Sequence, residues 1–202
     1  HKHNNKFYFK VCVVGGATAQ GAVNPNSKTN ALRIFGNKIK KTNKVDNILI
    51  MLGEVDCGFV IWVRSKRYNI SVDEQIQNSV NNLFHFIENI LKDKIYTSKD
   101  IILCGSVLPT IKDSTSKKFL KGARSEVDVS QYERTNKTLE YNNLLKQKSY
   151  ECGYKYIDIT KDIIGSDGLI KDFYLNKNPH DHHLDSSKTY NLWIYKLKNM
   201  NL

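Results

Sequence analysis

Residues 47–58 read NILIMLGEVDCG, and this stretch decides the fold class. An apolar run of strand length leads directly into a turn that begins with Gly53 and carries Glu54 and Asp56. Two other loops have a similar setting at the edge of a predicted element: GGATAQG (15–21) follows the apolar run FYFKVCVV (7–14), and HDHH (180–183) precedes a C-terminal helix. Because loops at the carboxyl ends of strands converge in open α/β sheets, we expect one site built from three distant segments.

The rest of the chain alternates between strand and helix patterns. The patterns predict strands at 7–14, 47–52, 100–106 and 154–159, and helices at 29–40, 71–92, 129–152 and 186–197. The clearest helix has apolar residues at steps of three and four and a capping-box pattern of Ser71 and Glu74. This alternation predicts a single domain (1–202), whether or not it is part of a longer protein, with a three-layer α/β/α fold and a mainly parallel, flavodoxin-like sheet.

A polar stretch at 111–128 interrupts this alternation. Loops of this length are uncommon in compact domains and often serve as lids or binding loops. Arg124 lies within it and Arg134 follows it. We therefore expect both arginines to contribute to a lid.

Composition limits the class of protein. Of the 202 residues, 40% are hydrophobic and 25% are charged, which disfavours disorder, and the longest apolar runs are too short to span a membrane. The four cysteines have no CxxC spacing, and we expect buried thiols in a reducing compartment, hence a cytoplasmic protein.

Neither the net charge nor the glycine-rich loop points firmly to a polyanion or a nucleotide. The formal charge is +11, but the lysines are spread along the chain, and the densest run (38–44) lacks interleaved aromatic residues. Gly16 and Gly21 have the spacing of a phosphate-binding loop, but Ala22 and Val23 follow where Lys and Ser or Thr are needed. We expect neither nucleic-acid binding nor nucleotide hydrolysis.

The three loops together resemble the motifs of one hydrolase family. GGATAQG (15–21), GEVD (53–56) and HDHHL (180–184) are similar in order and spacing to the motifs of the SGNH (GDSL-type) hydrolase superfamily. GEVDC (53–57) also resembles a divergent branch of that superfamily, which tends to occur beside surface-polysaccharide genes. The resemblance spans nearly the whole chain. It implies an SGNH-like fold and an esterase or O-acyltransferase acting on a carbohydrate or glycoconjugate.

The resemblance also assigns catalytic positions, with departures. The family's nucleophilic serine falls on Ala17, its preceding acid on Gly16 and its oxyanion-hole asparagine on Val55. Three explanations for Ala17 stay open: an engineered replacement of serine, a nucleophile shifted to Thr18, or a site that has given up hydrolysis. We favour Thr18, although a β-branched side chain is stiffer than serine and a nucleophile needs a base within reach. His183 matches the family's catalytic histidine.

The acid that orients His183 is less clear from the sequence. The family's aspartate position is occupied here by His180. Asp181 would have to orient the imidazole from a different angle, and Asp56 or Asp185 could do so through space. We assign the role to Asp181, because a carboxylate is what stabilises the imidazolium in a triad.

The remaining candidates for substrate binding are Gly16, Ala17, Gly21, Gly53, Glu54, Asp56 and Arg64. The glycines would shape an oxyanion or ligand pocket with their backbone. Glu54 and Asp56 would either bond the N–H groups of a tight turn or bind sugar hydroxyls or a cation. Arg64 lies in a basic, aromatic stretch that could hold an anionic group or a sugar ring.

We expect no metal and no other cofactor. The run at 180–183 contains residue types that bind metals, but neighbouring residues rarely all point at one ion. The predicted partner is a carbohydrate or acylated glycan. The alternative is a sugar-binding, nucleotide-sugar-binding or glycosyl-transferring module that keeps the crevice without hydrolysis.

Overall fold

Three parallel strands form the sheet of the computed structural model, which describes residues 7–42, 44–93 and 95–200. The order is β1 (Ile48–Met51), β2 (Ile101–Cys104) and β3 (Lys155–Ile157). Ile48 lies opposite Ile101, and Ile102 lies opposite Lys155. Helices occupy both connections between these strands, as parallel pairing requires. The predicted mixed α/β fold with a parallel sheet is confirmed.

The helices predicted from periodicity form close to the expected positions. They are α1 (Ala31–Lys41), α3 (Val72–Leu91), α5 (Gln131–Glu151) and α7 (Ser186–Lys198). Three further helices were not predicted: α2 (Ile61–Tyr68), α4 (Ala123–Glu126) and α6 (Thr160–Ile163). Short turns of other helical types are η1 (Asp56–Val60), η2 (Ser98–Asp100), η3 (Lys117–Phe119) and η4 (Asp172–Tyr174). Helix α3 starts at the predicted cap, because the Ser71 hydroxyl accepts a hydrogen bond from the backbone N–H of Glu74.

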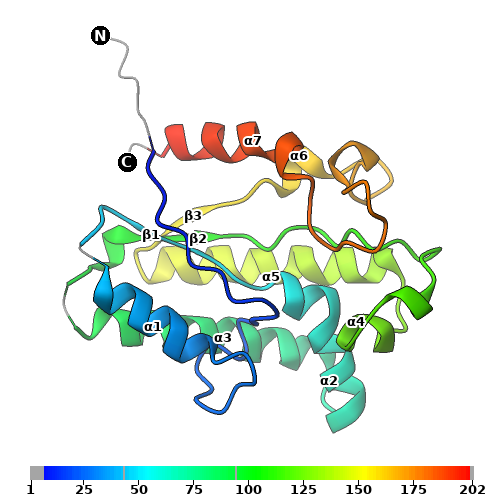
Figure 1. The fold of residues 1–202 in the computed structure, drawn as a ribbon, viewed down its shortest axis with the longest axis horizontal. Helices are drawn as coiled ribbons and strands as arrows, with labels where there is room; N and C mark the ends of the chain where they lie inside the picture. Colours follow the sequence, from blue (N-terminus) through cyan, green and yellow to red (C-terminus); the bar gives the residue numbers. More distant parts are fainter. Residues whose placement is uncertain (1–6, 43, 94, 201–202) are drawn as a thin grey trace.

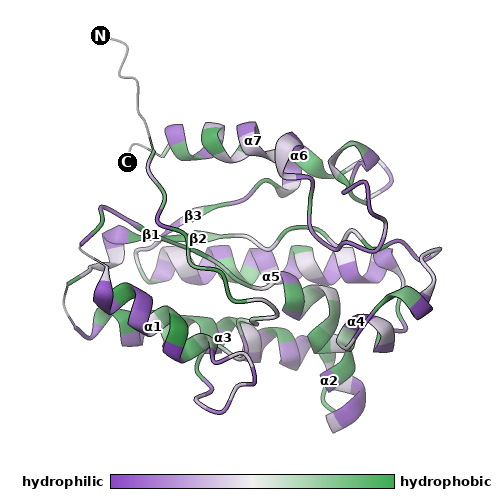
Figure 2. Cartoon of the chain, viewed as in Figure 1, coloured by the Kyte–Doolittle hydropathy of each residue, from purple (hydrophilic) through white to green (hydrophobic). Residues whose placement is uncertain are grey.

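Helices cover the sheet on both faces (Figure 1). Ile50 and Leu103 point toward α3 and α5 and join the largest core cluster. Ile102 and Cys104 point to the opposite face, where they pack with Leu197 of α7. The side chains of β2 therefore alternate between two buried surfaces, whereas on the edge strand β1 Leu49 and Met51 remain exposed. Figure 2 shows the hydrophobic colour along β1 and β2 and on parts of the helices around them, whereas α5 is coloured mainly hydrophilic.

The predicted first strand at 7–14 is wrong. These residues form no strand, and Tyr8 and Val13 are 89% and 81% exposed. Phe7 is partly buried against the core cluster on the α7 face. The apolar pattern reports only a local preference, whereas a strand also needs a ladder partner, and β1 is paired only with β2 among the described residues.

The long loop at 111–128 is anchored by a small core of its own. It includes η3 and α4, and its buried residues Ile111, Leu120 and Val127 pack against Phe59 of η1. The loop is thereby fixed beside the segment that follows β1. This contact brings the loop next to the candidate site.

The structure shows the state of the cysteines and the apolar character of the helices. All four cysteines are free thiols; Cys57 and Cys104 are buried as predicted, whereas Cys12 and Cys152 are only partly buried. Burial raises the pKa of Cys57 and of Cys104. Within the described residues, no helix has the length and apolar character needed to cross a membrane.

Candidate active site

Asp56 joins two of the three predicted loops. Its carboxylate is fully buried and accepts hydrogen bonds from the backbone N–H groups of Ala19 at 2.7 Å and Gln20 at 3.0 Å. It also accepts one at 2.8 Å from the hydroxyl of Ser79 on α3. Burial raises the pKa of Asp56, and these hydrogen bonds oppose that rise. Of the two predicted roles for Asp56, the structure therefore shows the bonding of turn N–H groups, which holds the glycine-rich loop against α3.

Gly53 makes the sharp exit from β1 that positions Glu54. Its φ of 123° favours glycine, and a Cβ at this position would lie 2.7 Å from Cε1 of the buried Tyr141. The chain turns directly into the helical segment that contains η1, and the Cys57 N–H bonds to the Gly53 carbonyl at 2.8 Å. Glu54 is thus placed where the carboxyl end of a parallel strand meets a helix, the usual position of ligand sites in such sheets.

Asp181 and His183 form a close acid–imidazole pair. The Nδ1 atom of His183 lies 2.6 Å from Oδ1 of Asp181, and the same oxygen accepts the backbone N–H of His183 at 3.0 Å. These hydrogen bonds hold the pKa of Asp181 below its usual value. The side chain of His183 is 62% exposed, so its Nε2 edge can be reached from solvent.

The other two predicted orienting acids have different partners. Asp56 is engaged with the glycine-rich loop, as described above. Asp185 caps α7, where its carboxylate accepts from the N–H and the hydroxyl of Ser187. Among the described acids, Asp181 is the one paired with His183.

Glu54 is a partly buried acid beside the histidines. Burial raises its pKa from 4.5 to about 7, and the nearby His183 opposes that rise. Its Oε1 atom is buried and has no hydrogen-bond partner among the described residues. Such a carboxyl group is protonated part of the time at neutral pH, so it can both accept and donate a proton.

His182 links this site to the long loop. Its ring contacts Phe59 edge-on, with 5.5 Å between centroids, and its Nδ1 lies 3.3 Å from Nη1 of Arg124. Burial lowers the pKa of His182 to about 4, with His183 and Arg124 acting in the same direction. The ring is therefore neutral at pH 7, and the guanidinium donates to Nδ1.

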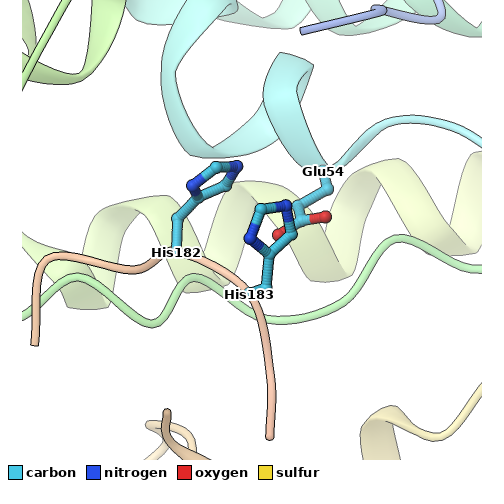
Figure 3. A group of neighbouring side chains, drawn as sticks. All are labelled: Glu54, His182 and His183. Carbon is cyan, nitrogen blue, oxygen red and sulfur yellow. The ribbon is translucent and has the colours of Figure 1, made fainter. Parts of the chain in front are cut away.

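Glu54, His182 and His183 are close enough to hold a metal ion together. Their ligand atoms all lie within 4.8 Å of one another (Figure 3). Asp181 would then orient His183 in the way that carboxylates orient metal-bound imidazoles. The guanidinium of Arg124 at His182 counts against the site, because it would repel a divalent cation.

The proposed nucleophile Thr18 is not hydrogen-bonded to His183. Its hydroxyl instead accepts the backbone N–H of Gly21 at 2.8 Å, so this N–H is not free to stabilise an oxyanion. The neighbouring N–H of Ala17 bonds to the Val14 carbonyl at 3.1 Å. The glycine-rich loop is therefore held mainly by its own hydrogen bonds and by Asp56.

Gly16 and Arg64, two more candidates for substrate binding, lie in the glycine-rich loop and on α2. Gly16 has a φ of 69°, which suits its place in the tight turn after 7–14. Arg64 is exposed on α2, where its guanidinium lies over the ring of Tyr68 at 5.5 Å. No hydrogen bond or ion pair joins Arg64 to Glu54 or to the histidines among the described residues.

Sequence reasoning missed two contributors to the site. Phe59 follows GEVDC directly, but an apolar residue there is indistinguishable from ordinary core. Arg124 was expected only as part of a lid, and nothing in its local sequence indicates a contact with His182, which lies 58 residues away. The Phe59 contact depends on how the histidine segment packs against η1, and the Arg124 contact on how the long loop folds beside that segment.

Comparison of the chain with protein-family models, with curated proteins and with solved structures gives no match. Membership of the SGNH superfamily therefore stays a prediction from the three motifs.

Proposed function

We propose that the chain is an SGNH-like esterase or O-acyltransferase acting on a carbohydrate, with His183 as general base. The observation that carries this proposal is the 2.6 Å pairing of His183 Nδ1 with Asp181 Oδ1. With Nδ1–H directed at a carboxylate, Nε2 keeps its lone pair and can take a proton from an attacking hydroxyl. The carboxylate then stabilises the imidazolium that forms.

The reaction needs an attacking hydroxyl, a base to take its proton and an acid to protonate the leaving sugar oxygen. A hydroxyl oxygen attacks the acyl carbon while its proton passes to Nε2 of His183. Collapse of the tetrahedral intermediate breaks the bond to the sugar oxygen, which takes a proton from His183 or from Glu54. The pKa of about 7 for Glu54 suits this second role.

The attacking hydroxyl is best supplied by water or by an acceptor alcohol. Ala17 has no hydroxyl, and that of Thr18 is bonded within its own loop. Direct attack by an activated water gives hydrolysis, and direct attack by a sugar hydroxyl gives acyl transfer. Thr18 stays the side-chain alternative. Its hydroxyl accepts from Gly21 and could still donate its proton, but its use would require a contact with His183 that the structure does not have.

The second candidate is a non-hydrolytic sugar or nucleotide-sugar binding or glycosyl-transferring module. The observation that favours it is the alanine at the nucleophile position, together with the engagement of the Ala17, Ala19, Gln20 and Gly21 N–H groups. Such a loop has few donors left for an oxyanion.

Acetate release from acetylated sugars separates the two candidates. The chain should release acetate, and His183→Gln should lower kcat by about 10²- to 10⁴-fold. A matched control is His85→Gln, because His85 is exposed on α3 away from the site, and it should leave the rate unchanged. Absence of acetate release from the unmodified chain would refute the hydrolase and favour the binding module.

A further inference from the structure

A pocket lies directly beside His182. It has a volume of about 310 Å³, is open to solvent, and is lined by η1, the long loop at 111–128 and the start of α5. Phe59 and Arg124 line it and also contact His182, so the pocket and the candidate catalytic site share a wall. A pocket of this size fits one sugar ring and is at the small end for ligand sites.

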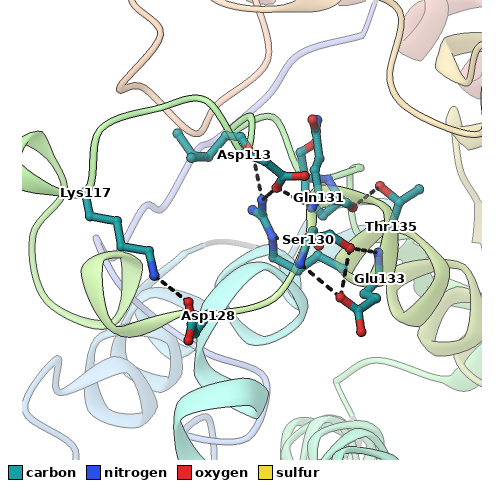
Figure 4. A network of polar contacts seen from close by, with 10 residues as sticks. Asp113, Lys117, Asp128, Ser130, Gln131, Glu133 and Thr135 are labelled. Atoms are coloured by element: carbon teal, nitrogen blue, oxygen red, sulfur yellow. Dashed lines mark hydrogen bonds and ion pairs between the residues drawn. The ribbon is translucent and has the colours of Figure 1, made fainter.

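Most cations that line this pocket are neutralised by a carboxylate. Lys112 pairs with Asp172 at 2.8 Å and Lys117 with Asp128 at 2.8 Å. The buried Arg134 lies 3.5 Å from Asp113 and donates to the Ile111 carbonyl at 2.7 Å. Figure 4 shows the Lys117–Asp128 pair and the polar network around Asp113 and the start of α5. These cations have little free charge to offer a ligand.

Arg124 is different from the other cations of the pocket. Among the described residues, no carboxylate lies within 4.0 Å of its guanidinium, and its one side-chain hydrogen bond is to His182. A guanidinium has five donors in a planar fork, a geometry that matches carboxylate and phosphate groups. The charge of a half-buried Arg124 is thus left without a counter-ion at the side of the pocket that faces the histidines.

The walls of the pocket also suit a sugar. Leu120 and Val127 present apolar surface, whereas Thr115 presents a hydroxyl group; the hydroxyl of Ser130 is engaged with Glu133 in the cap of α5. A pyranose ring has both C–H surface and hydroxyl groups, so it matches such a mixed lining. His180 stacks near Phe119 of the same loop, with 4.6 Å between ring centroids, which fixes the loop to the histidine segment.

We infer that Arg124 binds the acidic group of an anionic sugar, whose ring occupies the adjoining pocket while its acyl ester lies at His183. This inference rests on the proposed function and narrows its substrate class to sugars that carry a carboxylate or a phosphate. Arg124 is a binding residue in this arrangement, and His182 holds its guanidinium in place.

Equilibrium binding tests the inference without turnover. Calorimetric titration with glucose, glucuronic acid and glucose 6-phosphate compares a neutral sugar with the two sources of negative charge. We expect the dissociation constant of at least one acidic sugar to be about tenfold or more below that of glucose. Whichever of the two acidic sugars binds more tightly identifies the acidic group as a carboxylate or a phosphate. Arg124→Gln should remove this preference, and Arg124→Lys should restore part of it.

The controls separate this inference from the proposed function. Arg33→Gln removes an exposed arginine of α1 and should leave the preference intact. His183→Gln should also keep the preference for acidic sugars, whereas it should lose acetate release. Equal binding of all three sugars, no binding of any, or an unchanged preference in Arg124→Gln would overturn the inference, and none of these results depends on ester cleavage.

Discussion

Replacing Asp56 by alanine should strongly destabilise the protein. The substitution leaves three buried donors without an acceptor: the N–H groups of Ala19 and Gln20 and the hydroxyl of Ser79. A buried unsatisfied donor costs about 1–3 kcal/mol. The serine hydroxyl can rotate toward another acceptor, and the mutation also removes the cost of burying a carboxylate. We therefore expect the free energy of unfolding to fall by about 3–4 kcal/mol.

Urea denaturation followed by tryptophan fluorescence measures this change. Asp56→Asn keeps one carbonyl oxygen and should lose only about 2 kcal/mol. Asp46→Ala is the matched control, because Asp46 is exposed, and its effect should stay within about 0.5 kcal/mol. An Asp56→Ala variant as stable as the Asp46→Ala control would refute the reasoning that Asp56 anchors the glycine-rich loop.

Three further predictions concern the site itself. The pKa of Glu54 is about 7 in the folded chain and 4.5 in the unfolded chain, so the folded chain binds this proton more tightly. The contribution of Glu54 to the free energy of unfolding therefore falls as the pH rises between these two values. The unmodified chain should therefore lose up to about 3 kcal/mol relative to Glu54→Gln between about pH 5 and 8, and parallel stability curves would contradict the raised pKa. Acetate release should survive chelation by EDTA and fall when Zn²⁺ is added, since the ion would occupy Nε2 of His183. Loss of activity in EDTA would instead show that a bound metal is essential. Thr18→Val should keep the rate of acetate release within about tenfold, whereas near-complete loss that Thr18→Ser restores would identify Thr18 as the nucleophile.

The sequence was sufficient for those elements whose pattern is local. The apolar stripe and cap of α3, the apolar runs of β1 and β2, and the glycine after α5 are visible without tertiary information. Gly153 has a φ of 72°, the left-handed conformation that commonly ends a helix. Segment 7–14 has an equally clear apolar pattern and forms no strand, because strand formation also depends on a partner that the pattern does not specify.

The site was predictable in outline and not in detail. The GEVD turn contacts the glycine-rich loop through Asp56 and lies beside the histidines through Glu54, but no hydrogen bond joins the glycine-rich loop to the histidines among the described residues. Asp181, the orienting acid favoured from the sequence, is paired with His183. The engagement of Asp56 with Ser79, and of Arg124 with His182, depends on packing between segments distant in the chain. The raised pKa of Glu54 likewise follows from burial, which its sequence neighbours do not reveal.

The central claim is that Asp181 and His183 act as one unit in acyl transfer. The most direct test is kcat/KM for acetate release by Asp181→Asn, His183→Gln and the double variant. Residues that act as a unit have non-additive effects, so the double variant should be no slower than His183→Gln alone. The claim would be contradicted if the losses in kcat/KM of the two single variants multiplied in the double variant. Full activity of Asp181→Asn would also contradict it.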